Sequence, residues 1–116
     1  MMLRVSGQVS GEHADLSLVT GHGMDDGGVP YGRSLIAFVE AVMGDDDGVL
    51  ANRRQQLAEA IGGEALVDAT AVIAMFNYLD RVADATGIPL DEMLESTTKD
   101  IRSSLGIDEW KTAKSR

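Results

Sequence analysis

The chain has 116 residues, enough for one domain with a small hydrophobic core. Nineteen acidic residues against ten basic ones give a formal charge of −9, which would repel a phosphate backbone, so nucleic-acid binding is disfavoured. Cysteine is absent, which excludes disulfides, thiolate nucleophiles and cysteine-based zinc sites in this chain.

Residues 1–32 are rich in Gly, Ser, His and Asp, and Gly27, Gly28 and Pro30 form a strong break at their end. Two alternating runs within them, "LRVSGQV" and "ADLSLV", predict either brief strands or extended arms. We expect an irregular, Gly-rich N-terminal arm. No apolar run here or later reaches the length of a signal peptide or a membrane helix, so we expect a cytoplasmic protein that does not enter a membrane.

Two helices are predicted after the break. The first, over 34–43, opens at Ser34 and is apolar nearly all round except at Glu40, which is typical of a buried helix. The second covers 49–61, with Asp47 as its expected cap, and ends at two glycines. Its apolar stripe consists of Leu50, Leu57 and Ile61.

A long third helix is predicted from about residue 64 to residue 86. Its segment "AVIAMF" (71–76) is apolar on every face, so other parts of the protein must cover it. Gly87 and Pro89 mark its exit, and a fourth helix follows over 90–105. The apolar face of the fourth helix consists of Leu90, Leu94, Thr97, Ile101 and Leu105.

These patterns predict an all-α fold, a small bundle of about four helices. The helical domain covers residues 33–106, between the arm over 1–32 and a frayed C-terminal tail over 107–116.

Residues 33–93 also contain an order of helices and polar residues that can be compared with a known family. A helix like "LIAFVEAVM", a short helix, a Gly-containing turn and a long helix ending in "FNYLDRVADATGI" (76–88) resemble the C-terminal half of the alkylhydroperoxidase D-like (AhpD-like), carboxymuconolactone decarboxylase superfamily. Asp80 stands where the family pattern more often has Asn. The peroxidase members carry a CxxC with nearby His and Glu, and this chain has no cysteine, so the family's reactive centre has no counterpart in it.

The second half of the third helix contains a cluster of polar residues, Asn77, Asp80, Arg81 and Asp84. Asn77 and Arg81 are four residues apart and Arg81 and Asp84 three, so their side chains can satisfy one another. One interpretation is a partly buried ion pair that fixes how the helix docks; the other is a ligand site. Glu40 likewise lies either on an exposed edge or, as a carboxyl group in apolar surroundings, in an acid–base or ligand-binding role.

No cofactor or metal is expected. "GHGMDDGG" (21–28) misses the spacing of a dinucleotide-binding loop, and its aspartates would repel a pyrophosphate. His13 and His22, with Asp25 and Asp26, have no recognised metal-ligand spacing.

We therefore predict a non-catalytic helical protein derived from the AhpD-like superfamily that oligomerises or binds a small ligand. The alternative is a subunit of a peroxidase-like or decarboxylase-like enzyme whose reactive half, with its CxxC, lies on a partner chain. Two helices that are apolar all round predict a homodimer or a higher homo-oligomer built from the first and third helices. The expected interface residues are Phe38, Val42, Val72, Met75 and Phe76.

Overall fold

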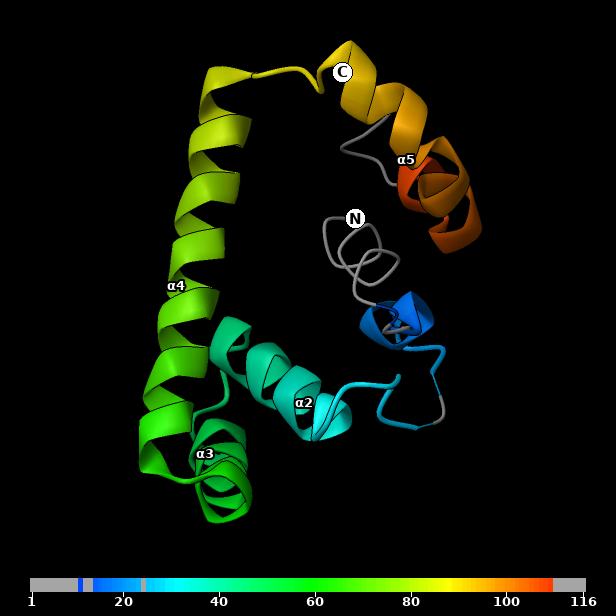
Figure 1. Ribbon diagram of the computed structural model, residues 1–116. Coiled ribbons are helices and arrows are strands. Elements are labelled where there is room, and N and C mark those ends of the chain that lie inside the picture. The colour runs from blue at the N-terminus through cyan, green and yellow to red at the C-terminus, as the bar shows by residue number, and fades with distance from the viewer. Residues whose placement is uncertain (1–10, 12–13, 24, 110–116) are drawn as a thin grey trace. The chain divides into compact units, whose positions relative to one another are not determined.

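The computed structural model describes residue 11 and residues 14–23 and 25–109, and the regular structure in these residues is entirely helical (Figure 1). The prediction of an all-α fold is confirmed. The α-helices are α2 (Gly32–Met43), α3 (Asp47–Ile61), α4 (Gly63–Thr86) and α5 (Glu92–Leu105), and the short 3-10 helices are η1 (Leu16–Thr20) and η2 (Ile107–Glu109).

The chain divides into two compact units. The α2–α4 unit comprises Val29–Ile88, and the terminal unit comprises Met1–Gly28 together with Pro89–Arg116. The predicted helical domain over 33–106 is therefore divided, with α5 grouped with the N-terminal segment. The division follows α4, which ends at Gly87 in the left-handed conformation (φ 65°), and the next residues are not helical.

Helices α2 and α3 supply the core of the α2–α4 unit. Phe38 and Ala41 of α2 and Leu57 of α3 are buried, and Leu57 is only 1% exposed. The stripe predicted for α3 is confirmed in part, since Leu50 and Ile61 are half-buried beside it. The cap lies one residue earlier than predicted, because the Asp46 carboxylate accepts a hydrogen bond from the Val49 backbone N–H at 3.0 Å.

Helix α4 follows α3 after a single residue, Gly62, whose φ of 86° favours glycine. Figure 1 shows α2 and α3 against the N-terminal half of α4. With 24 residues α4 is about 36 Å long, whereas the 15 residues of α3 span about 22 Å. The shorter helices therefore cannot cover α4 along its whole length, and no residue of α4 is buried.

In the terminal unit, η1 packs against α5 and their shared core consists of Leu18, Thr98 and Ile101. Thr98 is buried, whereas the sequence pattern predicted Thr97 on the inner face of this helix. Its hydroxyl donates to the Leu94 carbonyl at 2.6 Å and accepts from Arg102 Nη1 at 2.7 Å. Both hydrogen bonds satisfy a hydroxyl that burial would otherwise penalise.

The N-terminal segment has local order that the pattern did not predict. The run "ADLSLV" forms most of η1 rather than a strand or an extended arm, because Asp15 caps the turn and its backbone N–H donates to the Gly27 carbonyl at 2.8 Å. A Cβ at Gly23 would lie 2.7 Å from Leu18 Cα, so only glycine fits there. The run "LRVSGQV" lies outside the described residues.

The C-terminal tail begins with η2 rather than with a frayed end. Arg102 Nε donates to the Asp108 carboxylate at 3.0 Å, which ties η2 to α5. Residues 110–116 of the predicted tail lie outside the described residues.

Candidate interaction surface

Helix α4 exposes large apolar side chains along most of its length. Val72 and Met75 are each 51% exposed, Leu79 is 49% exposed and Val82 is 39% exposed. The four are spaced at three, four and three residues, so they lie along one side of the helix, and we call them the α4 stripe. Phe76, at 56% exposed, flanks this stripe.

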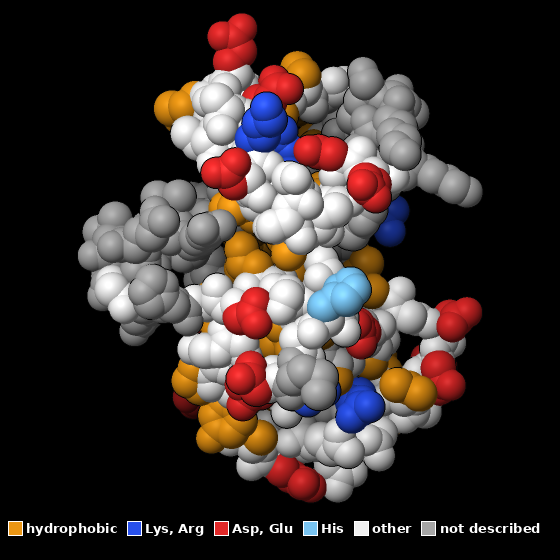
Figure 2. Space-filling view, turned by 90° about the vertical axis from the view of Figure 1, so that its right-hand side faces the viewer, with side chains coloured by type: hydrophobic (Ala, Val, Ile, Leu, Met, Phe, Trp, Pro, Cys, Tyr) orange, Lys and Arg blue, Asp and Glu red, His pale blue; other side chains and the backbone are white. Residues whose placement is uncertain are grey.

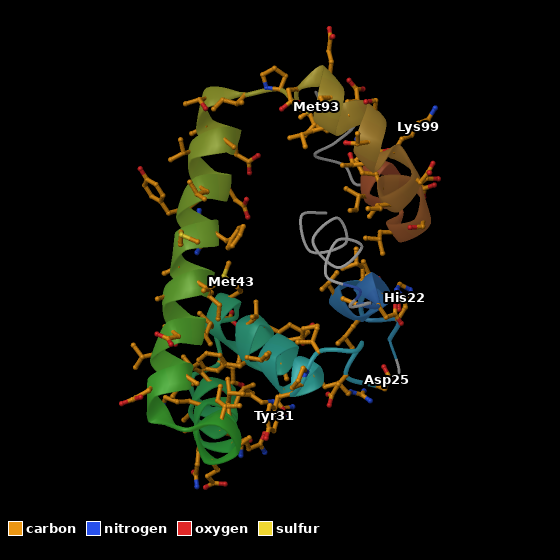
Figure 3. All side chains as sticks on the ribbon, viewed as in Figure 1. His22, Asp25, Tyr31, Met43, Met93 and Lys99 are labelled. Atoms are coloured by element: carbon orange, nitrogen blue, oxygen red, sulfur yellow. The ribbon has the colours of Figure 1, made fainter. Side chains whose placement is uncertain are left out.

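The α4 stripe lies on the side of α4 that faces away from α3. The half-buried residues Leu66, Ala69 and Ile73 mark the side packed against α3. At 3.6 residues per turn, the centre of the stripe lies about 130° around the helix from the centre of these three residues. In Figure 3 the side chains of α4 project on both sides of the ribbon. The apolar side that "AVIAMF" begins is therefore left without cover inside the α2–α4 unit.

The predicted interface residues separate into two groups. Val72, Met75 and Phe76 are exposed on α4, as an interface requires. Phe38, at 3% exposed, lies in the core of the unit and its side chain is not accessible to a partner, while Val42 is half-buried. The prediction for Phe38 is therefore corrected. It had no basis in periodicity, because a helix that is apolar all round does not reveal which side faces the core.

Leu79 and Val82 were not among the predicted interface residues. Both continue the spacing of Val72 and Met75 over about two more turns, so the period of the helix contained the signal. The polar residues at positions 77, 80 and 81 interrupt the apolar run, so this periodicity was not recognised.

The predicted polar cluster is present but it is not a buried ion pair. Arg81 Nε donates to Asn77 Oδ1 at 3.0 Å, and Asn77 Nδ2 contacts Met43 Sδ at 3.8 Å. Arg81, Asp80 and Asp84 are all exposed. The expectation of a partly buried pair fails because α2 ends at Met43, which Figure 3 shows beside α4, and α4 continues past it.

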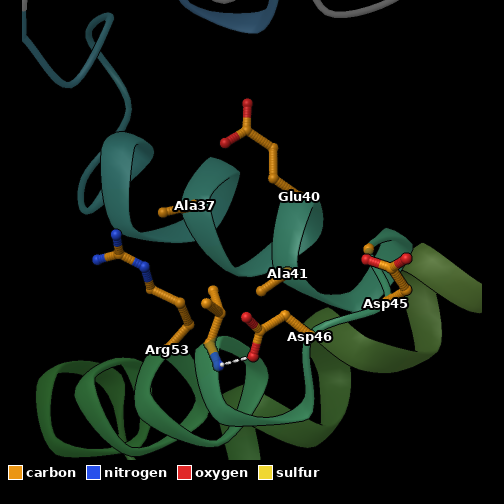
Figure 4. Close-up of a pocket in the computed structure, with 8 residues that line it drawn as sticks. Ala37, Glu40, Ala41, Asp45, Asp46 and Arg53 are labelled. Carbon is orange, nitrogen blue, oxygen red and sulfur yellow. Dashed lines mark hydrogen bonds between the residues drawn. The ribbon is translucent and has the colours of Figure 1, made fainter.

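Glu40 lies on the exposed edge of α2, so the burial on which an acid–base role depends is absent. Glu40 also lines a small pocket between α2 and α3, with a volume of about 220 Å³. In Figure 4 the Glu40 carboxylate points away from α3, and the Asp46 carboxylate is engaged in capping. Small-molecule sites usually enclose about 300–1,000 Å³, which is more than this pocket encloses. This open pocket, lined also by Asp45 and Arg53, does not favour the ligand-binding alternative.

Other classes of site find no support among the described residues. Within them, no group of three or more His, Asp or Glu residues is placed to hold a metal ion. His22 is instead within 3.0 Å of the Thr20 hydroxyl, while His13 lies outside the described residues. Figure 2 shows acidic side chains spread over the visible face, with no basic patch that would offset the charge of −9. None of the described helices is both long enough and apolar enough to span a membrane.

Comparison with known proteins adds no relative, since no protein-family model, curated protein or solved structure matches this chain. The resemblance of residues 33–93 to the AhpD-like superfamily therefore stays a prediction from the sequence pattern.

Proposed function

We propose that this chain is a non-catalytic helical protein of AhpD-like descent that self-associates through α4. The observation that carries the proposal is the exposure of the α4 stripe: a 24-residue helix with a continuous apolar side buries none of its residues. Contiguous apolar patches of this kind mark interaction sites on soluble proteins.

A second copy of the chain is the occupant that this surface favours. The stripe consists of aliphatic and thioether side chains with no charged residue between Val72 and Val82 on that side of the helix. Such a surface is complementary to another helix with the same face, and two-fold pairing of identical patches is the commonest oligomer.

The energy of burial is consistent with a weak dimer. Each side chain of the stripe is about half exposed, so covering it contributes about 1 kcal/mol. Together, the four stripe residues and Phe76 of both copies contribute on the order of 10 kcal/mol. The loss of rigid-body freedom on association costs about 4–15 kcal/mol. The expected dissociation constant is therefore micromolar or weaker, and the protein concentration must be varied in any test.

The AhpD-like part of the proposal is supported by "FNYLDRVADATGI" at the C-terminal half of α4 and by the order of the preceding helices. The chain has no cysteine thiolate, so it contributes no CxxC chemistry.

A pair of charge insertions tests the proposal. Met75→Glu places a carboxylate in the stripe and should weaken association by at least about 100-fold, since a buried unpaired charge is strongly unfavourable. Ala74→Glu adds the same charge at an exposed position of the same helix, away from the stripe, and should leave association unchanged. Light scattering gives the mass of each variant, and circular dichroism verifies that both remain helical. Equal masses for the two variants would refute the proposal.

A further inference from the structure

The spacing of the α4 stripe reads the same in both directions along the helix. Val72, Met75, Leu79 and Val82 follow one another at three, four and three residues, so the pattern is symmetric about position 77. If two copies of α4 lie antiparallel with their centres at that position, Val72 of each meets Val82 of the other and Met75 meets Leu79. All four apolar side chains of each copy are then used.

From this symmetry, and resting on the proposed self-association, we infer that the two α4 helices pair antiparallel about a two-fold axis level with Asn77. The apolar spacing alone permits a parallel pair as well, in which each residue meets its own copy. The charges next to the stripe distinguish the two arrangements.

Asp68 is the next residue on the same side of α4, four residues before Val72. In a parallel pair the Asp68 carboxylates of the two copies would face each other, and like charges at directly opposed positions are unfavourable. In the antiparallel pair each Asp68 instead lies opposite Thr86, whose side chain is neutral and donates to the Val82 carbonyl. The antiparallel arrangement also opposes the two helix dipoles, a smaller contribution of the same sign.

The rest of the α2–α4 unit leaves room for this arrangement. The side of α4 that packs on α3 carries Leu66, Ala69 and Ile73, about 130° around the helix from the stripe, so a second copy can approach without displacing α3. The symmetric register overlaps the two helices over residues 68–86, which keeps the first turn of α4 and its link to α3 outside the contact.

Because the chain has no cysteine, single cysteines report the register without background. Val72→Cys and Val82→Cys are prepared as separate chains, one of them tagged to change its mass, mixed at a concentration where the dimer forms, and oxidised. Antiparallel pairing predicts a disulfide between the two different chains. It predicts no disulfide in a dimer of two identical variants. There the two cysteines lie about 15 Å apart along the axis, whereas a disulfide requires Cβ atoms about 3.8 Å apart.

The controls separate this inference from the proposed function. Ala74→Cys mixed with Val82→Cys should not cross-link, because position 74 lies outside the stripe. If sedimentation shows a dimer but Val72→Cys cross-links with itself, or the mixed disulfide does not form, the antiparallel register is wrong while self-association stands. If the cysteine variants and the unaltered chain are all monomeric, both proposals are wrong.

Discussion

Arg81 donates a hydrogen bond from Nε to Asn77 Oδ1 at 3.0 Å, one turn earlier on α4, and the pair lies where α4 extends beyond the end of α2. The exposure of this hydrogen bond determines how much stability is lost when Arg81 is replaced. Arg81→Ala should change the free energy of unfolding by no more than about 0.5 kcal/mol, because exposed pairs of this spacing contribute little. Urea unfolding measures the change.

Leu57→Ala is the comparison for that measurement. Leu57 is fully buried between the helices of the α2–α4 unit, and its truncation should cost about 2–4 kcal/mol. Comparable losses for Arg81→Ala and Leu57→Ala would show that Arg81 has a buried partner after all.

Tyr31 precedes α2 with a φ of 60°, a left-handed conformation that non-glycine residues rarely adopt. Asn tolerates this region and β-branched residues do not, so Tyr31→Asn should be more stable to thermal unfolding than Tyr31→Val by about 1–2 kcal/mol. Asn52→Val, on the exposed side of α3, exchanges the same two residue types where helix propensities are similar and should change little. Equal stability of the two Tyr31 variants would contradict the assigned backbone conformation.

Asp15 has a pKa below its ordinary value of 3.8, because the Ser17 hydroxyl and the Ser17 backbone N–H donate hydrogen bonds to its carboxylate. A carboxyl group with a depressed pKa in the folded state stabilises that state above the unfolded pKa. The contribution is lost as the pH falls through the lower, folded pKa.

Ser17→Ala removes the hydroxyl donor and should therefore move the pKa of Asp15 upward, towards 3.8. A carbon-detected NMR titration of the Asp15 carboxyl group follows this shift. Ser96→Ala is the matched control, since the Ser96 hydroxyl donates to the Met93 carbonyl and has no contact with Asp15. A pKa of Asp15 that is the same in Ser17→Ala and in the unaltered chain would rule out the hydroxyl as a cause.

Salt concentration tests what holds the proposed dimer together. Each copy carries a formal charge of −9, and the α4 stripe contains no charged residue, so two copies repel at long range and attract through apolar contact. Raising the ionic strength screens the repulsion but not the apolar contact, so the association constant should increase. A decrease on adding sodium chloride would indicate an interface held by ion pairs instead.

The helix ends were largely predictable from local chemistry. Gly62 and Gly87 stop α3 and α4 where the sequence placed those ends, because both adopt positive φ values that glycine accommodates. The cap of α3 was displaced by one residue, since "DDD" offers three equivalent aspartates and only the folded backbone selects Asp46. The local sequence did not predict η1, because its turn depends on a hydrogen bond from the Asp15 N–H to the distant Gly27 carbonyl.

The candidate surface was predictable only in part. Val72, Met75 and Phe76 were identified as interface residues because nothing in the chain pattern could cover them, and they are exposed in the α2–α4 unit. The burial of Phe38 and the exposure of Arg81 both depend on where α2 crosses α3 and where it ends relative to α4. Such packing geometry is not contained in the periodicity of a single helix.

The central claim, that α4 joins two copies of this chain, is tested most directly by sedimentation equilibrium of the unaltered protein over a concentration series from micromolar to millimolar. The account predicts a weight-average mass that rises with concentration from 12.3 kDa towards twice that value and fits a monomer–dimer equilibrium. A mass that stays at 12.3 kDa throughout the series would contradict it, and the α4 stripe would then have to be covered by residues of the same chain.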